Sequence, residues 1–300
     1  MESAVWVLAA ACTGLLLLLL KVATAIWWKP LQVKKYFESQ GIRGPPYRVF
    51  NGNTPDITRM INEEKCKPMP FSHDILPRVF PHYHQWSKAY GQDFIFWFGP
   101  QARLFVPHPE LIKEILSTKF GNYTKIRSNP LASQLISQGL VGLTGEKWAQ
   151  HRRIINPAFH MDLLKVGMIL NETLRLYPPS VFLQRQTYKP MKLGRLSIPA
   201  GIQLMLPILA IHHDPTLWGH DANDFNPGRF SEGVSRASRH PMAFMPFGLG
   251  PTMCVGQNFA LLEAKVALAM ILQRFSFVTS PSYTHAPMLL LTLRPQHGAQ

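Results

Sequence analysis

The chain has 300 residues, of which 46% are hydrophobic and only 16% are charged, and its net charge is +14. This composition excludes an intrinsically disordered chain and allows one large folded domain with its own core. The positive charge does not predict nucleic-acid binding, because the basic residues are spread along the chain without an aromatic-interleaved run. Contact with anionic lipid and with an acidic protein partner is the simpler interpretation.

The chain begins with an apolar segment, Ala4–Leu20, which ends in six consecutive leucines and is roughly as long as a membrane-spanning helix. Lys21 interrupts it, but the apolar sequence continues to Trp28, and a lysine near a helix end can reach the membrane surface. A cleavable signal peptide is the alternative interpretation. It is disfavoured by the acidic Glu2 and by the lack of a small-x-small site followed by a polar start. We therefore predict a transmembrane signal-anchor over residues 1–28.

The segment 29–48 is basic and contains Gly44-Pro45-Pro46, and we predict that it links the anchor to a folded domain over residues 49–300. Positively charged residues next to a membrane helix stay in the cytosol, so the domain is expected to be cytosolic. The basic residues that follow the span are Lys29, Lys34, Lys35, Arg43 and Arg48.

Hydrophobic periodicity predicts a mainly α-helical domain with small β-sheets, an α+β fold. Glycine and proline place a turn at 198–202, and a loop-rich stretch runs from 212 to 245. The predicted helices cover residues 31–40, 58–64, 109–117, 147–155 and 163–177, and the predicted strands cover 94–98 and 103–106.

Cys254 stands on a glycine-rich loop, Phe247-Gly-Leu-Gly-Pro-Thr-Met-Cys-Val-Gly256, directly before an apolar segment from Gln257 to Phe275. The start of a helix favours a negatively charged sulfur, and glycines allow the backbone to come close to a flat ligand. These features suit a thiolate ligand to haem iron. The alternative is a buried structural cysteine before a core helix. The three cysteines, Cys12, Cys66 and Cys254, are not spaced like a disulfide framework, which favours a reducing compartment.

The loop resembles the signature Phe-x-x-Gly-x-Arg-x-Cys-x-Gly of cytochrome P-450 haem-thiolate monooxygenases at Phe247, Gly250, Cys254 and Gly256. The resemblance implies that Cys254 is the axial ligand of the iron of haem b. Thr252 departs from the pattern, since the family has an arginine there, and an arginine would donate a charge-assisted hydrogen bond to a haem propionate.

Further motifs of the same family occur in the family's order. Glu172-Thr-Leu-Arg175 resembles its Glu-x-x-Arg motif, and Phe225-Asn-Pro-Gly-Arg-Phe230 resembles the segment that supplies a third charge, Arg229. The resemblance implies that these three charges form a structural triad behind the haem, which is tolerable in a core only if every donor is hydrogen-bonded.

The sequence also contains residues that resemble the family's ligands for the haem propionates. Trp148-Ala-Gln-His-Arg152 resembles the family's Trp-x-x-x-Arg, and Arg185 matches a family arginine that follows Leu176-Tyr-Pro-Pro179. The resemblance implies that the indole N–H of Trp148 and the guanidinium groups of Arg152 and Arg185 bind the propionates.

The C-terminal part is similar to the plant clan that contains secologanin synthase and related terpenoid and hormone hydroxylases, at Phe259–Val266 and Pro281–Pro287. Membership implies an apolar small-molecule substrate, electrons from NADPH through a membrane-bound reductase, and attachment to the endoplasmic reticulum membrane. No nucleic-acid partner is expected.

One part of the family's sequence has no counterpart. Members carry a central block of roughly 200 residues between the Trp-x-x-x-Arg and Glu-x-x-Arg helices, far longer than a connector needs. Here the two flanks meet near residues 165/166, and no Ala/Gly-x-Asp/Glu-Thr-Thr stretch of the distal, oxygen-activating helix is present. We therefore assign no catalytic residue, and we expect large apolar surfaces to be exposed.

Two hypotheses about function remain open at this stage. The first is a monooxygenase that hydroxylates an apolar small molecule. The second is a catalytically inactive, truncated haem-binding remnant, or a chain that does not fold. Other interpretations are weaker: His212, His213, His220 and His240 lack the spacing of a zinc site, and a cytosolic chain would not be glycosylated at the sequons of Asn122 and Asn171.

Overall fold

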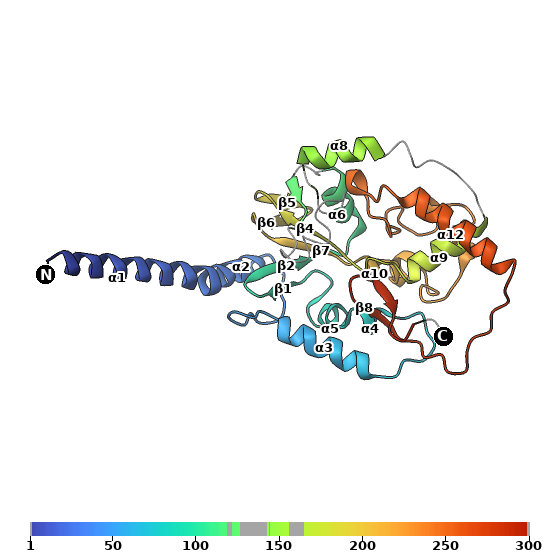
Figure 1. The fold of residues 1–300 in the computed structure, drawn as a ribbon, viewed down its shortest axis with the longest axis horizontal. Coiled ribbons are helices and arrows are strands. Elements are labelled where there is room, and N and C mark those ends of the chain that lie inside the picture. The colour runs from blue at the N-terminus through green and yellow to red at the C-terminus, as the bar shows by residue number, and fades with distance from the viewer. Residues whose placement is uncertain (1, 119–121, 127–142, 144, 156–164, 299–300) are drawn as a thin grey trace.

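The computed structural model describes residues 2–118, 122–126, 143, 145–155 and 165–298. The chain begins with one uninterrupted helical run made of α1 (Glu2–Ala23), a π-helical turn η1 (Thr24–Trp28) and α2 (Lys29–Glu38). Figure 1 shows this run projecting away from the rest of the molecule. Within the described part, the stretch Ala11–Glu38 is the one helix long and apolar enough to cross a bilayer, and its apolar window is not buried.

The segment predicted as a linker, 29–48, packs against the domain. The helix predicted over 31–40 is α2, which begins two residues earlier, and its Phe37 is fully buried together with Ile42. The Tyr47 hydroxyl donates a hydrogen bond to the carbonyl of Ile26. The helical run is therefore fastened to the core by its second half.

A five-stranded sheet lies at the centre of the domain, with the strand order β1-β2-β7-β4-β3. Strand β2 pairs in parallel with β7, and the other neighbours are antiparallel. Side chains alternate between the faces of a strand. The strands are β1 (Ile95–Phe98), β2 (Gln101–Phe105), β3 (Tyr123–Thr124), β4 (Leu183–Thr187) and β7 (Gln203–Leu206). The two strands predicted at 94–98 and 103–106 are confirmed as β1 and β2.

One face of the sheet is covered by α3 (Thr54–Cys66), α4 (Leu76–Val79) and α5 (Pro81–Tyr90). An aromatic cluster fills this layer, in which the rings of Phe96 and Phe105 stack with centroids 5.0 Å apart. The sequence predicted part of α3 but not α4 or α5. The buried face of α5 is built from His82, Tyr83 and Trp86, which give only a weak apolar period.

Short elements cover the other face and lead to the cysteine loop. Most of these elements are short, because glycine and proline interrupt them. They are α6 (Pro109–Lys113), the π-helical turn η2 (Glu114–Thr118), the hairpin β5 (Met191–Leu193) with β6 (Leu196–Ile198), α10 (Ile208–His212), α11 (Pro215–Trp218), and the 3-10 turns η5 (Pro227–Phe230), η6 (Val234–Arg236) and η7 (Gly250–Thr252). The helices predicted at 109–117 and 147–155 correspond to α6 with η2 and to α8 (Gly145–Ile155).

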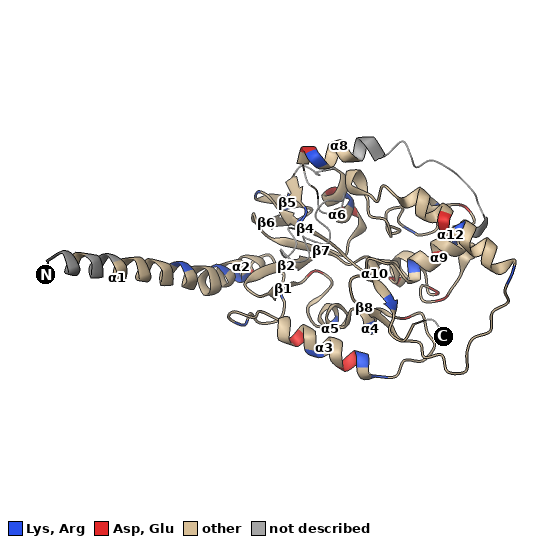
Figure 2. Ribbon diagram, in the orientation of Figure 1, with Lys and Arg blue, Asp and Glu red and all other residues tan. Residues whose placement is uncertain are grey.

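Two longer helices lie side by side, α9 (Lys165–Leu176) and α12 (Gln257–Leu272), as Figure 1 shows. No residue of α12 is buried; Phe259 is 54% exposed and Leu272 is 59% exposed. Figure 2 shows how few charges the helix carries. The expected exposure of a large apolar surface is thus present at α12.

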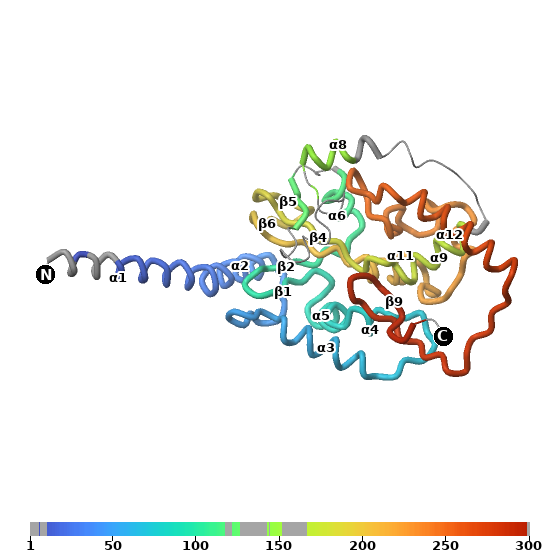
Figure 3. The backbone as a smooth tube through the Cα atoms, in the orientation of Figure 1, coloured from blue at the N-terminus to red at the C-terminus, as the bar shows by residue number. Residues whose placement is uncertain are grey.

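The chain ends in a small hairpin of β8 (Pro287–Leu289) and β9 (Leu293–Pro295), which Figure 3 shows folding back beside α4 after a long excursion from α12. The sequence did not predict this hairpin. Overall the domain is mainly helical with small sheets, so the predicted fold class is confirmed.

Candidate functional site

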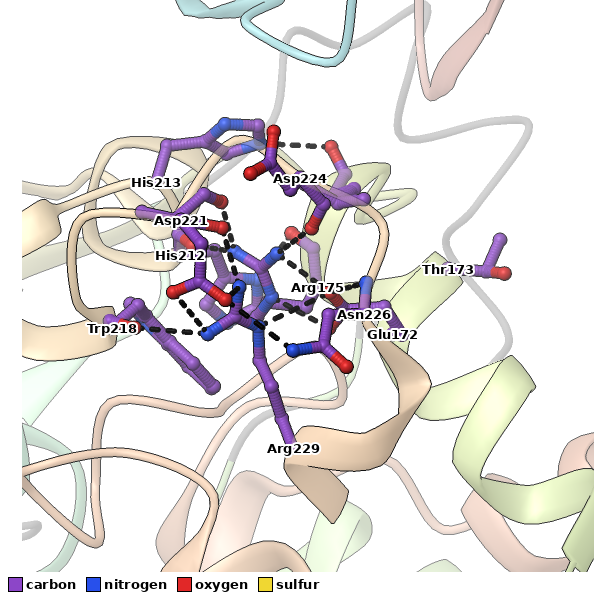
Figure 4. Close-up of polar contacts among 12 residues, drawn as sticks. Glu172, Thr173, Arg175, His212, His213, Trp218, Asp221, Asp224, Asn226 and Arg229 are labelled. Carbon is purple, nitrogen blue, oxygen red and sulfur yellow. Dashed lines mark hydrogen bonds and ion pairs between the residues drawn. The ribbon is translucent and has the colours of Figure 1, made fainter.

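The three charges predicted as a triad do meet in the core. Glu172 and Arg175 are both fully buried on α9 and form a bidentate pair, in which Arg175 Nε lies 2.7 Å from Glu172 Oε2 and Nη2 lies 2.8 Å from Oε1. Arg229 on η5 donates from Nε to Glu172 Oε1 over 3.3 Å. Figure 4 shows these side chains converging, while Thr173 on the same helix points away. The i, i+3 spacing on one helix face brings Glu172 and Arg175 together.

Backbone carbonyls satisfy the remaining donors of Arg175. Its Nη1 donates to the carbonyls of His212 and Ala222, at 2.7 and 2.6 Å, and Nη2 donates to that of Asp224 at 3.2 Å. The guanidinium also lies 5.1 Å from the centre of the Trp218 ring. A buried ion pair is tolerated only with such complete pairing, so Arg175 clamps the segment 212–224 onto α9.

A fourth charge, Asp221, belongs to the network and was not predicted from the sequence. Arg229 lies 2.9 Å from Asp221 Oδ1 and 2.6 Å from Oδ2. The hydrogen bond from Arg229 lowers the pKa of Asp221 to about 2. Asp221 lies in the loop that follows His212, and no motif surrounds it. Its one sequence signal is its position eight residues before Arg229.

His212 connects this network to Met245, whose carbonyl accepts from the N–H of Gly248 in the cysteine loop at 3.0 Å. Its Nδ1 lies 3.1 Å from the carbonyl of Arg175, and its Nε2 accepts a hydrogen bond from the N–H of Met245 at 3.1 Å. Burial lowers the pKa of His212 to about 3, so the ring is neutral and donates from Nδ1. A neutral imidazole is the state that can bridge a carbonyl and an N–H. In the sequence, His212 was considered only as a zinc ligand, and the spacing of the histidines did not support that role.

Cys254 follows η7 and lies three residues before the start of α12, as the sequence predicted. Its N–H donates to the carbonyl of Phe247 at 2.8 Å, which closes the loop, and the residue is exposed. Gly256 precedes the first residue of α12, and a Cβ there would lie 4.0 Å from the Cys254 sulfur. The thiol is therefore on the surface of the loop rather than packed in a core, which disfavours the buried structural cysteine.

Gly250 is required by protein packing. Its φ is +70°, and a Cβ at this position would lie 2.2 Å from the carbonyl oxygen of Leu116. The prediction was that glycines in this loop allow close approach to a ligand. At Gly250 the structure shows the close approach of Leu116 on η2, and with the positive φ this contact explains the need for a glycine; the approach to a ligand stays a prediction.

A cavity of about 450 Å³ lies beside η7 and contains three of the residues assigned to the propionate side. They are Trp148 on α8, Arg185 on β4 and Thr252, and Lys125 and Tyr123 also contribute to the wall. Lys125 Nζ lies 5.7 Å from the centre of the Trp148 ring. Arg152 is on α8, but its side chain lies outside the part of the chain that the structure describes.

Arg185 and Thr252 contact each other directly, which the sequence did not predict. Arg185 Nη2 donates to the Thr252 hydroxyl oxygen at 2.9 Å, and Nη1 donates to the carbonyl of Gln184 at 2.8 Å. Burial lowers the pKa of Arg185 to about 10. Arg185 is thus a 9% exposed cation that donates to two neutral oxygens at the wall of a cavity, an arrangement that fits a carboxylate ligand.

No group of three or more His, Cys, Asp or Glu side chains capable of holding a metal ion occurs among the described residues. His213 is used in packing: its Nε2 lies 3.0 Å from the carbonyl of Leu176 and its Nδ1 lies 2.7 Å from Asn223 Oδ1. A haem needs only one protein ligand to its iron from this loop, so a single exposed Cys254 is compatible with it.

Comparison with known proteins places the chain in a family. The family model for cytochrome P450 matches residues 77–168 and 161–298, which is most of the chain. The chain therefore belongs to the cytochrome P450 family, and the predicted membership is confirmed.

Several plant relatives are similar over nearly the whole chain. Cytochrome P450 734A1 of Arabidopsis thaliana is 30% identical over 488 aligned positions, which span 94% of this chain and 94% of the relative. CYP72A616 of Paris polyphylla is 29% identical, with 99% of this chain and 96% of the relative covered. CYP72A219 of Panax ginseng is 27% identical, with 100% and 98% covered.

Membership in this family implies haem iron as the cofactor and a redox partner that supplies electrons, with an apolar substrate. The residues present fit a haem in two ways. Cys254 offers an exposed sulfur on a glycine loop, and Arg185 with Lys125 and Trp148 offers hydrogen-bond donors at a cavity wall.

Proposed function

We propose that this protein is a membrane-anchored haem-thiolate monooxygenase that hydroxylates an apolar small molecule of the terpenoid or hormone type. When bound, the haem would supply the activation of oxygen. The observation that carries the proposal is the connection of the cysteine loop to the Glu172–Arg175–Arg229 triad through His212. Through this connection, the buried triad fixes the position of the loop that carries Cys254.

Each residue assigned to the site has a role under this proposal. Cys254 would ligate the iron, and Phe247, Gly250 and Gly256 would shape its loop. Trp148, Arg152 and Arg185 would hold the two propionates by hydrogen bonds from N–H donors. The triad would position the loop without contacting the haem. Electrons would arrive from NADPH through a partner reductase.

A second candidate is a haem-binding protein without turnover, which rests on the proposed absence of a central block. The alignment with the Arabidopsis relative runs over 488 positions and this chain has 300 residues, which supports the proposed absence of a central block. The two segments that match the family also meet at 161–168, close to the junction inferred at 165/166. The exposed α12 is the surface that such an absence would leave uncovered.

One experiment separates the two candidates. Purified full-length protein, reconstituted with haem, would be reduced under carbon monoxide and its difference spectrum recorded. A thiolate-type Soret band is expected for both candidates, because the cysteine loop is present in both. Hydroxylated product from a panel of terpenoids with a plant reductase and NADPH would support the monooxygenase, whereas a thiolate band without product would support the non-catalytic binder.

The anchor gives a separate prediction. We expect the chain to stay with endoplasmic reticulum membranes after extraction with alkaline carbonate, because residues 11–38 form a helix whose apolar window is not buried in the protein. A variant that lacks residues 2–28 should be released by the same treatment. Release of the full-length chain, or glycans at Asn122, would contradict the proposed anchor with its domain in the cytosol.

Thr252 gives a further prediction. Replacing Thr252 with Arg adds a guanidinium beside Arg185 at the cavity wall, where a propionate would gain a charged donor. We expect haem affinity to rise by about one to two decades, which corresponds to about 1–3 kcal/mol. Haem content would be measured by titration at limiting haem.

The matched control is Thr252→Val, which keeps the shape but removes the hydroxyl that accepts from Arg185, and which should not raise affinity. Equal haem affinity in the threonine and arginine proteins would show that position 252 does not face a propionate. We expect no gain in hydroxylation in either case, because neither change supplies a distal helix.

A further inference from the structure

The helix α12 is apolar on two opposite sides, and one of these sides is exposed. Leu261 and Leu268 are half-buried on the inner side, where α9 packs against the helix. The outer side carries large apolar residues at the spacing i, i+4 and i+8, which places them in one row along the helix. This row, the α12 stripe, consists of Leu262, Val266 and Met270, which are 37%, 50% and 52% exposed. A helix that is apolar on all sides is normally buried, so the exposed stripe indicates an interface.

The apolar surface continues beyond the helix and is large enough for a stable dimer. Together with the stripe, the apolar side chains that follow it expose roughly 700 Å², if a fully exposed aromatic side chain offers about 200 Å². A specific interface buries about 600–1,000 Å² on each partner, whereas the largest apolar patch of an ordinary monomer covers about 300–600 Å². The side chains that follow the stripe are Leu272, Phe275, Phe277 and Val278, which are between 59% and 92% exposed.

Two other occupants of this surface are disfavoured. Figure 1 shows α1 projecting from one end of the molecule and α12 near the other end, so a bilayer that holds the anchor is distant from the stripe. A partner recognised by charge is also disfavoured, because the stripe has no charged residue and Glu263 beside it is acidic, although the whole chain carries a net charge of +14. A surface with the same apolar chemistry fits the stripe better, and a second copy of the chain provides one.

We propose that α12 forms the interface of a homodimer, in which the two helices pack antiparallel around a two-fold axis at Val266. The stripe is self-complementary in this arrangement. Val266 faces Val266 of the second copy, and Leu262 lies against Met270 of the second copy, because both residues are four positions from Val266. Rows of this spacing interdigitate in the commonest class of helix packing, and the flexible methionine adapts to the leucine. The interface does not depend on haem.

The test measures the mass of the full-length chain by sedimentation equilibrium, in a detergent whose density is matched to that of the buffer. We expect a dimer at micromolar protein concentration. Each copy carries a net charge of +14, so charge repulsion opposes the dimer and added salt should tighten it. An association driven by opposite charges would weaken under the same change.

Two variants of the stripe and one control complete this measurement. Val266→Glu should weaken the dimer at least about tenfold, because it places two carboxylates at the centre of an apolar contact. Met270→Glu, in the same row, should act in the same direction. Both changes are at half-exposed side chains, so the far-ultraviolet circular dichroism should not change. Leu291→Glu, the control, introduces the same charge at an 80% exposed leucine between β8 and β9 and should leave the dimer intact.

A photoreactive benzophenone side chain at position 270 locates the contact. Chains with natural and with heavy nitrogen are mixed, so a cross-link between copies can contain one peptide of each kind. Trypsin cuts after Lys265, which separates the peptides that contain Leu262 and Met270. The antiparallel arrangement predicts cross-links from position 270 to the peptide of the second copy that ends at Lys265.

Three outcomes overturn the proposal. A monomer at every concentration would show that the stripe does not bind a second copy. A dimer that persists in both stripe variants would place the contact elsewhere, for example in the anchor helix α1. Cross-links confined to one copy, or to the peptide 266–274 of the second copy, would contradict the antiparallel contact.

Discussion

Replacing Cys254 with Ala or Ser is expected to abolish the thiolate-type Soret band of the ferrous–carbon monoxide complex completely. Cys254 is exposed and stands just before the start of α12, where the positive end of the helix dipole favours a negatively charged sulfur. Cys66 is the last residue of α3, at the negative end of that helix, and Cys12 lies within the N-terminal apolar helix. Neither of them offers a comparable ligand.

The matched control is Cys66→Ser, which removes an exposed thiol from the same domain and should leave the spectrum unchanged. Haem content should be measured in parallel, because a serine protein could retain haem through the propionate side alone. A thiolate-type band that survives in Cys254→Ser would show that another residue ligates the iron.

Replacing Glu172 with Gln is expected to destabilise the domain by about 3–5 kcal/mol. The change keeps the shape but leaves the buried Arg175 and the nearly buried Arg229 without their shared carboxylate. The amide oxygen of Gln can still accept from the Asn226 N–H, which donates to Glu172 Oε1 at 2.9 Å, but the amide NH2 group then faces Arg175 Nε, so two donors meet. The measurement is the midpoint shift in denaturant-induced unfolding of the full-length chain.

Glu232→Gln is the control, because Glu232 pairs with Arg236 on the surface at 3.3 Å, with both side chains more than two-thirds exposed. An exposed pair of this kind contributes at most about 1 kcal/mol. If the two variants lost the same stability, the buried network could not be what fastens the segment 212–229 to α9. The Glu172 variant should in addition lose haem, since His212 connects the network to Met245.

The sequence alone predicted the parts of the site that local spacing controls. Glu172 and Arg175 are three residues apart on a helix, so their pairing follows from helix geometry once the helix is predicted. The position of Cys254 before α12 likewise follows from glycines that precede a long apolar segment. The N-terminal helix and strands β1 and β2 were predicted for the same reason, since their patterns repeat within one element.

Only the tertiary structure decided which distant residues share the site. Asp221 joins Arg229, His212 joins Met245, and Thr252 accepts from Arg185, each across a stretch of chain whose path no local pattern specifies. Gly250 is needed because Leu116 approaches it, which depends on how η2 packs against the loop. Periodicity reports the neighbours of a residue within its own helix or strand, whereas these contacts depend on loop paths and on packing between elements.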